Sequence, residues 1–235
     1  MKNLFFSIKN HILDLFYPKI CAGCASEGVL ICRECEKAIV IRTPQCFICD
    51  RRSPDARVCR SCKKHTAYTR MYGPLSFKND IVREMVHRLK YRGVKEYGVI
   101  LGQFLAKATS YYALLPKKDA VIISVPLHPK RMRTRGFNQA EIIAKTYSEL
   151  SNIPLADSES IIRRKNTPPQ TTVADRSKRM ENMRDVFFVK NATDFFGKTV
   201  ILIDDVATTG STINEAARAL KRGGAREVWV FTAAR

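Results

Sequence analysis

Two adjacent acids, Asp204 and Asp205, lie between an apolar stretch and a loop of small and hydroxylated residues. The apolar stretch at 200–203 is too short for a helix and predicts a strand buried on both faces, and the periodic apolar residues after the loop predict a helix. In such a unit the loop amides and the helix amino terminus converge on one point, where they can hold a phosphate. Carboxylates can accept hydrogen bonds from sugar hydroxyls, so we expect this segment to bind a ribose 5-phosphate. The alternative is that the acids and threonines only cap the next helix. The predicted phosphate loop consists of Ala207, Thr208, Thr209, Gly210, Ser211 and Thr212.

The ordered string at 200–212 resembles the 5-phosphoribosyl-1-pyrophosphate (PRPP) signature of type I phosphoribosyltransferases. The resemblance implies that Asp204 and Asp205 hold the ribose diol and that the loop holds the 5-phosphate. It also implies Mg²⁺ bound with PRPP, mostly through substrate oxygens. Catalysis in such transferases is electrostatic and positional, with no nucleophilic side chain. The sequence shows no recognisable nucleobase-reading segment, so no acceptor is predicted.

A second segment, at 126–139, is strongly cationic and follows the apolar run at 121–125, which predicts another buried strand. It stands where type I phosphoribosyltransferases have their pyrophosphate loop, and the resemblance therefore implies that role. The alternative is a basic connection that touches no ligand. The residues predicted for this loop are Pro126, Leu127, His128, Lys130, Arg131, Arg135, Gly136, Asn138 and Gln139.

Residues 135–141 read Arg-Gly-Phe-Asn-Gln-Ala-Glu, which resembles a hallmark of the ComF (competence protein F) family. That family resembles this chain over nearly its whole length: an amino-terminal helix, a cysteine-rich zinc module, a Lys-Tyr-x-Gly turn at 90–93, the basic loop and a phosphoribosyltransferase-like domain. The resemblance implies a role in natural competence, meaning natural transformation with uptake of single-stranded DNA. Single-stranded DNA and competence translocation proteins are the partners that it implies.

Eight cysteines, all between 21 and 62, form four Cys-x-x-Cys pairs. Two such pairs can converge on one metal, and four thiolates make a closed tetrahedral zinc site. We therefore expect two structural zinc ions, with either neighbouring pairs or cross-braced pairs sharing an ion. The alternative, a disulfide framework, requires an oxidising compartment. The predicted ligands are Cys21, Cys24, Cys32, Cys35, Cys46, Cys49, Cys59 and Cys62.

A third basic segment, at about 163–184, contains two prolines and few apolar residues, which predicts a mobile loop. Closure of such a loop over an anionic ligand would exclude water and add positive charge. A disordered linker is the alternative. In this segment the ComF resemblance is carried by Arg163, Gln170, Thr171, Arg176 and Asn182.

The chain carries 41 Lys and Arg against 22 Asp and Glu, a formal charge of +19 that should attract polyanions and phosphorylated ligands. A basic surface also serves solubility, so the charge alone does not choose among DNA, RNA and nucleotides. No apolar run approaches the roughly 20 residues of a membrane helix, and the first residues lack the pattern of a secretory signal. We expect a cytoplasmic protein, with at most peripheral contact with the inner face of the cytoplasmic membrane.

The elements that must position these residues alternate between strand and helix from residue 70 onward. This alternation predicts an α/β fold, a doubly wound parallel sheet of the type I phosphoribosyltransferase kind, with ligands beyond the carboxyl ends of the strands. We expect a strand at 71–77, helices at 79–89 and 97–115, and a last strand at 228–232 after a helix stop at Gly223 and Gly224.

The predicted organisation has three parts: an amphipathic helix at 1–18, a double zinc-ribbon module at 19–66, and the phosphoribosyltransferase-like domain at 70–235. Three functions stay open. The protein is a phosphoribosyltransferase with an unknown acceptor, a PRPP-sensing regulator, or a non-enzymatic single-stranded DNA-binding module.

Overall fold

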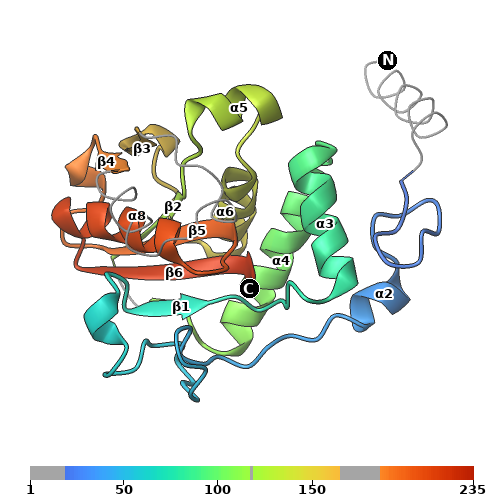
Figure 1. Cartoon of the computed structure of the whole chain (residues 1–235), viewed down its shortest axis with the longest axis horizontal. Coiled ribbons are helices and arrows are strands. Elements are labelled where there is room, and N and C mark those ends of the chain that lie inside the picture. Colours follow the sequence, from blue (N-terminus) through green and yellow to red (C-terminus); the bar gives the residue numbers. More distant parts are fainter. Residues whose placement is uncertain (1–18, 117–118, 165–185) are drawn as a thin grey trace, which may run out of the picture.

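A parallel four-stranded sheet forms the centre of the protein in the computed structural model of Figure 1, which describes residues 19–116, 119–164 and 186–235. The strand order is β1 (Arg70–Tyr72), β6 (Glu227–Ala234), β5 (Thr199–Val206), β2 (Ala120–Ser124). Every pairing in this sheet is parallel, so the carboxyl ends of the strands lie at one edge. The predicted helix at 1–18 and residues 165–184 of the predicted mobile loop lie outside the described residues.

Side chains of β5 alternate between the two faces of the sheet, as consecutive residues of a strand do. Ile201 and Ile203 pack into one hydrophobic core, and Val200 and Leu202 pack into another on the opposite face. The first face is covered by α3 (Asp80–Tyr91), α4 (Glu96–Tyr111) and α6 (Gln139–Ser151), and the second by α8 (Ser211–Arg222). Helices on both faces of a parallel sheet confirm the predicted doubly wound α/β fold.

Shorter elements complete the described chain. They are α2 (Arg33–Lys37), α5 (Pro129–Arg135), the strands β3 (Ile161–Arg163) and β4 (Phe187–Val189), and the 3-10 turns η1 (Lys63–His65), η2 (Ser158–Ser160) and η4 (Ala192–Asp194). The strands β3 and β4 pair with each other in an antiparallel manner, apart from the main sheet. Figure 1 shows α5 and this strand pair on the upper side of the view, with β1 below them. No helix within the described ranges is long and apolar enough to cross a membrane.

The predicted helix at 79–89 is α3. It begins at its predicted position because the Asn79 side chain accepts hydrogen bonds from the N–H groups of Ile81 and Val82. The helix α8 ends at Arg222, directly before the predicted stop at Gly223. Capping residues and glycines therefore marked these boundaries correctly.

Two predicted elements are shorter in the structure. The first strand ends at Tyr72 instead of residue 77, because Pro74 has no N–H to give to a strand pairing and only an isolated bridge follows at Leu75. The helix α4 ends at Tyr111 instead of 115, before Ala113 takes a positive φ of 50°. In both cases the apolar pattern continued beyond the regular backbone.

The cysteine module docks at two separate places. The first ribbon (residues 19–37) lies beside α3, and the second ribbon (residues 45–66) lies under β1, as Figure 1 shows. Ala22 of the first ribbon packs into the core on the α3 and α4 face. Phe47 and Val58 of the second ribbon share a core with α8 on the other face.

Candidate functional site

Asp204 and Asp205 lie near the carboxyl end of β5, where strand alternation directs them toward different faces of the sheet. Asp205 meets α3, because Lys90 Nζ lies 3.0 Å from its Oδ1. Asp204 lies toward β3, and the charge of Arg163 acts on it. Each Oδ1 also accepts the next backbone N–H: Asp204 from Asp205 at 2.8 Å, and Asp205 from Val206 at 2.6 Å. These bonds hold one oxygen of each carboxylate against the backbone.

The pKa of Asp204 is raised to about 7, first by burial and then by the negative charge of Asp205. Lys90 and Arg163 lower this pKa without offsetting the two larger effects. The carboxyl of Asp204 therefore changes its charge close to neutral pH. Its ionised form accepts hydrogen bonds from hydroxyl groups, and its protonated form is also a donor.

The loop after β5 leads into the amino terminus of α8, as the sequence predicts. Gly210 takes a φ of 72°, a left-handed conformation that favours glycine. The hydroxyls of Thr209 and Ser211 lie 3.1 Å apart beside it. The free N–H groups and the dipole at the start of a 12-residue helix attract an anion. The structure thus brings the predicted phosphate-loop residues 207–212 together around one helix terminus.

The second ribbon supports this loop from behind. A Cβ at Gly210 would lie 3.4 Å from Cε1 of Phe47 and 3.7 Å from the hydroxyl of Tyr68. One helical turn further on, Asn214 Oδ1 accepts the backbone N–H of residue 67 at 2.8 Å, and its Nδ2 donates to the carbonyl of residue 65 at 3.3 Å. These contacts could not be predicted from the sequence, because they join segments far apart in the chain.

The predicted cationic loop contains the helix α5, so the prediction of a continuous loop at 126–139 was wrong. Pro126 and Leu127 join β2 to this helix. His128 caps it by accepting the Lys130 N–H on Nδ1 at 3.2 Å, and a proline follows at the first helical position. Gly136, with a φ of 76°, ends it. The capping pattern was readable in the sequence, but the cationic character of the segment suggested a loop.

Two polar residues fix the next helix to the end of β2. Asn138 Nδ2 donates to the carbonyl of Val125 at 3.1 Å, while its Oδ1 accepts the N–H of Ala140 at 3.1 Å and caps α6. Gln139 is almost fully buried, and its Oε1 accepts from Arg135 Nη1 at 3.0 Å. The Nε2 of Gln139 has no hydrogen-bond partner among the described residues. A buried donor of this kind is available to a ligand.

The turn between α3 and α4 packs against this segment through two cation–aromatic contacts. The Arg135 guanidinium lies 5.6 Å from the centre of the Tyr91 ring. The Lys95 ammonium lies 5.2 Å from the centre of the Phe137 ring. With the Lys90 contact to β5, the Lys-Tyr-x-Gly turn at 90–93 is part of the site, which the sequence alone did not indicate.

Arg163 lies in β3, and its side chain is buried and 5.6 Å from the centre of the Phe187 ring. Placing it within a mobile loop was therefore wrong. Burial, then the positive charge of Arg131, lowers its pKa to about 10, and Asp204 acts in the opposite direction. The charges of Asp204 on β5 and of Arg131 on α5 thus both act on Arg163. The other residues predicted for that loop, Gln170, Thr171, Arg176 and Asn182, lie outside the described residues.

Each ribbon gathers four cysteine sulfurs within 4.8 Å of one another. In the first, Cys24 Sγ and Cys32 Sγ lie 3.7 Å apart, and in the second Cys49 Sγ and Cys59 Sγ lie 3.6 Å apart. A tetrahedral Zn–S₄ centre with bonds of about 2.3 Å has sulfur spacings of about 3.8 Å, so these two pairs of sulfurs already have the spacing of zinc ligands. The groups are Cys21, Cys24, Cys32, Cys35 and Cys46, Cys49, Cys59, Cys62.

This grouping is the sequential pairing, and the cross-braced alternative is wrong. The two centres are alike in detail, since the first sulfur of each accepts a backbone N–H: Cys21 Sγ from Cys32 at 3.3 Å, and Cys46 Sγ from Cys59 at 3.5 Å. Four thiolates fill the coordination sphere of a zinc ion. The clusters therefore support structural zinc.

The sheet is parallel and covered by helices on both faces, and its inner strand β5 leads through an acid pair into the amino terminus of a helix. This arrangement is that of a phosphoribosyltransferase-like domain. Comparison with protein families agrees with this class. Residues 133–235 match the phosphoribosyl transferase domain, and residues 12–63 match the double zinc ribbon domain.

Proteins similar in sequence identify the family within this class. Competence protein ComFC of Bacillus subtilis (strain 168) is 31% identical over 213 residues, 86% of this chain and 82% of that protein. DNA utilization protein YhgH of Escherichia coli O157:H7 is 33% identical over 153 residues, 63% of this chain and 64% of its own. Among solved structures, a glutamine PRPP amidotransferase from B. subtilis overlays with a TM-score of 0.39 at 20% identity, over 58% of this chain and 26% of its own. The chain belongs to the ComF family of competence proteins.

Proposed function

We propose that the protein binds PRPP together with Mg²⁺ at the carboxyl edge of its sheet and acts in the handling of DNA during natural competence. One observation carries the first part: the acid pair, the Gly210 turn and the amino terminus of α8 follow one another without a break at the end of β5. A ribose 5-phosphate offers hydroxyls for carboxylates and a phosphate for a helix terminus.

In this proposal each segment of the site takes one part of PRPP. Asp204 and Asp205 accept hydrogen bonds from the ribose hydroxyls, and the loop at 207–212 holds the 5-phosphate. The cations of α5 and Arg163 face the pyrophosphate, whose oxygens share Mg²⁺ with few protein ligands. The buried Arg163 supports this placement, because the charges that act on it include those of Arg131 and Asp204.

Transfer from such a site would need no nucleophilic side chain. An acceptor would attack the anomeric carbon as the bond to pyrophosphate breaks, and pyrophosphate would leave with the bonding electrons. Positive charge then develops on the ribose and negative charge on the leaving group, beside the α5 cations and Arg163. The acceptor is unassigned, and binding without transfer would make the protein a PRPP sensor.

The competence role rests on relatives. A relative with 31% identity over most of this chain is named for competence, and another is named for DNA utilization. The formal charge of +19 suits contact with a polyanion. We propose that the protein performs this role in the cytoplasm, with single-stranded DNA or the translocation machinery as partner.

Isothermal calorimetry with PRPP and Mg²⁺ tests the site. We expect binding by the wild type, and a loss of about a hundredfold in Asp204→Asn/Asp205→Asn, because two charge-assisted hydrogen bonds are weakened by about 1.5 kcal/mol each. The matched control is Glu149→Gln, an exposed acid on α6, which should bind as the wild type does. Wild-type protein that does not bind PRPP would refute the proposal.

A pyrophosphate-release screen with bases, nucleotides and single-stranded DNA then distinguishes a transferase from a sensor. Release of pyrophosphate with one of these acceptors would show transfer, and binding without release would favour a sensor.

A DNA-binding module is the second candidate, and exposed cations favour it. Lys130 and Arg133 on α5, and Arg51, Arg52 and Arg60 on the second ribbon, are all exposed. Reversing the three ribbon arginines to Glu should weaken binding of single-stranded DNA and reduce its salt slope by about 2, since each phosphate contact contributes roughly 0.7. The double aspartate variant should keep most DNA binding. Equal loss in both variants would show that one surface serves both ligands.

A further inference from the structure

Lys90 connects two elements of the site that are distant in the chain. It lies in the last turn of α3, and its Nζ is 3.0 Å from Oδ1 of Asp205 at the end of β5. The two side chains are 19% and 11% exposed, so water screens this ion pair only weakly. The same Oδ1 accepts the N–H of Val206 at 2.6 Å. The Asp205 carboxylate is therefore held from two directions.

The position of Lys90 follows from the packing of its neighbours. Leu89 is fully buried in the core on the α3 face, and it anchors the end of the helix to the sheet. Tyr91 lies against the guanidinium of Arg135. Arg88 donates to the carbonyl of Ile20 at 2.6 Å. The buried Leu89 thus fixes the end of the helix and keeps the backbone of Lys90 close to Asp205.

The charges around the acid pair come from three elements besides β5. Lys90 on α3 is bonded to Asp205, Arg163 on β3 acts on Asp204, and Arg131 on α5 acts on Arg163. Two adjacent carboxylates repel each other and would also repel the phosphates of a polyphosphate ligand. An ammonium group bonded to one carboxylate reduces both repulsions.

We propose that Lys90 is a positioning residue of the ribose site: its ion pair holds the Asp205 carboxylate in one orientation, so that Oδ2 meets a ribose hydroxyl. This inference rests on the proposed binding of PRPP. It divides the acid pair into two unequal members. The ammonium group of Lys90 on α3 compensates the negative charge of Asp205. Asp204, whose pKa is raised, exchanges a proton near neutral pH.

A purely structural role for Lys90, in which it only ties α3 to the sheet, makes a different prediction. Loss of a structural tie lowers stability, and it leaves the pH dependence of ligand binding unchanged. Loss of the cation in the proposed role raises the pKa of Asp204 further, because Lys90 is one of the charges that lower it. Binding that requires ionised acids then moves to higher pH.

The test compares the wild type with Lys90→Met, Lys90→Arg and the matched control Lys107→Met, an exposed lysine on α4. Calorimetry with PRPP and Mg²⁺ is run from pH 6 to pH 8.5. We expect Lys90→Met to bind about tenfold more weakly at pH 7, because a poorly exposed acid has lost its partner, and to recover part of this loss at pH 8.5. Lys90→Arg and Lys107→Met should bind nearly as the wild type does.

A second measurement needs no PRPP. Carbon-13 NMR of labelled aspartate should show one carboxyl that titrates near pH 7 in the wild type and at higher pH in Lys90→Met. The inference is overturned if that titration does not move. It is also overturned if Lys90→Met binds PRPP with the wild-type pH profile. Failure of the wild type to bind PRPP would instead refute the proposed function, and the NMR titration would still decide whether Lys90 controls the acid pair.

Discussion

The two zinc ribbons have the same ligand pattern but different relations to the rest of the protein. The first ribbon packs small or partly buried side chains, those of Ala22, Leu30 and Ile31, on the α3 and α4 face. Its backbone is also bonded there, since Arg88 and the Tyr97 hydroxyl both donate to the carbonyl of Ile20. The second ribbon places large apolar side chains, including Phe47, into the core beneath α8. The same metal-binding unit can thus serve as an attached lobe or as a part of the domain core.

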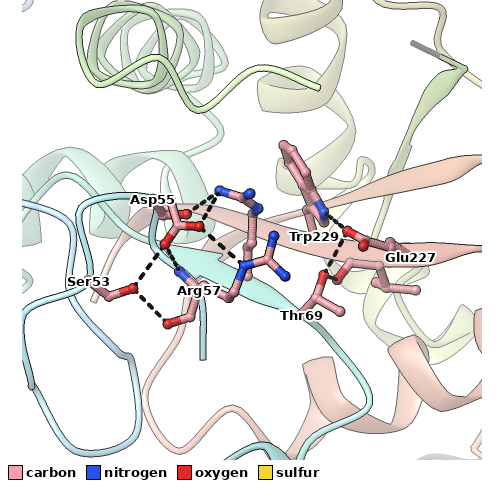
Figure 2. Close-up of polar contacts among 8 residues, drawn as sticks. Ser53, Asp55, Arg57, Thr69, Glu227 and Trp229 are labelled. Atoms are coloured by element: carbon pink, nitrogen blue, oxygen red, sulfur yellow. Dashed lines mark hydrogen bonds and ion pairs between the residues drawn. The ribbon is translucent and has the colours of Figure 1, made fainter. Parts of the chain in front are cut away.

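Polar contacts strengthen the second docking. Figure 2 shows Asp55 of the ribbon bonded to Arg57, and Glu227 of β6 bonded to Trp229 and Thr69. Asp55 also pairs with Arg70 of β1 at 3.2 Å, and the Arg70 guanidinium stacks over the Trp229 ring at 4.3 Å. At the other end of the sheet Arg235 pairs with Asp50 at 2.7 Å and donates to the Phe47 carbonyl.

The difference also concerns the site, because each ribbon lies behind a different part of it. The second ribbon contacts Gly210 of the phosphate loop and, through the carbonyl of residue 65, Asn214 of α8. The first ribbon is bonded to Arg88, two residues before the Lys90 that pairs with Asp205. Zinc in the second ribbon should therefore stabilise the fold and the phosphate loop together, and zinc in the first should matter mainly for its own lobe.

The largest expected effect comes from removing one ligand of each ribbon. Structural zinc contributes about 10–16 kcal/mol to the folding of small ribbons. Cys46→Ser should lose one zinc, the cooperative unfolding of the main domain and PRPP binding, because Cys46 is buried in the shared core. Cys21→Ser should lose one zinc and keep the cooperative unfolding of the main domain. Its affinity for PRPP should fall much less than that of Cys46→Ser, because among the described residues the first ribbon reaches the site only through Arg88, two residues before Lys90. Zinc content, calorimetric unfolding and PRPP binding are measured for both variants. Equal losses of stability and PRPP binding would contradict the view that only the second ribbon is part of the domain core.

Asn214→Ala, at the second ribbon, should lower both stability and ligand affinity, by less than Cys46→Ser does. It removes two hydrogen bonds between α8 and the second ribbon and leaves a backbone N–H without its acceptor, at a cost of about 2 kcal/mol in the free energy of unfolding. Because α8 begins at the phosphate loop, the affinity for inorganic phosphate or PRPP should fall together with the free energy of unfolding. Urea unfolding and calorimetry measure the two effects. An unchanged affinity would show that the loop does not depend on the ribbon.

Tyr97→Phe is the matched variant at the first ribbon. The hydroxyl of Tyr97 lies 3.2 Å from the Ile20 carbonyl and 3.1 Å from the Leu30 carbonyl, and removing it should cost about 1 kcal/mol. Affinity for PRPP should stay at the wild-type value, because the first ribbon does not touch the phosphate loop in the described residues. The same urea and calorimetric measurements apply. A loss of affinity would place the first ribbon in the site as well.

The part of the site that could be predicted from the sequence is the part made of neighbouring residues. The strand, acid pair and loop at 200–212 were readable because their order in the chain is their order in space. Each Cys-x-x-Cys pair was readable for the same reason. Lys90 and Asp205 were not connected, because their contact depends on how α3 packs on the sheet.

Arg163 shows a different limit of the sequence. Its strand β3 has only three residues, and its pairing partner β4 lies beyond residues 165–185. A pairing across such a long and basic segment leaves no periodic signal near Arg163, so the residue was assigned to the neighbouring loop. The helix α5 was missed because its charged residues hid a capped, glycine-terminated helix.

The smallest expected effect concerns Asp55, which links the second ribbon to β1. Burial raises its pKa, but hydrogen bonds from Arg57 and the charge of Arg70 outweigh burial and leave the pKa below its usual value. A carboxyl with a lowered pKa stabilises the fold above about pH 4 and loses that contribution as the pH falls further. Asp55→Asn should therefore cost less than about 1 kcal/mol at pH 7, since the pair is half exposed. Urea unfolding from pH 3 to pH 7 measures the free energy of unfolding of the variant and of the wild type, and the difference between them should shrink below pH 4. A difference that is constant with pH would mean that Asp55 stabilises the second ribbon by packing and not by charge.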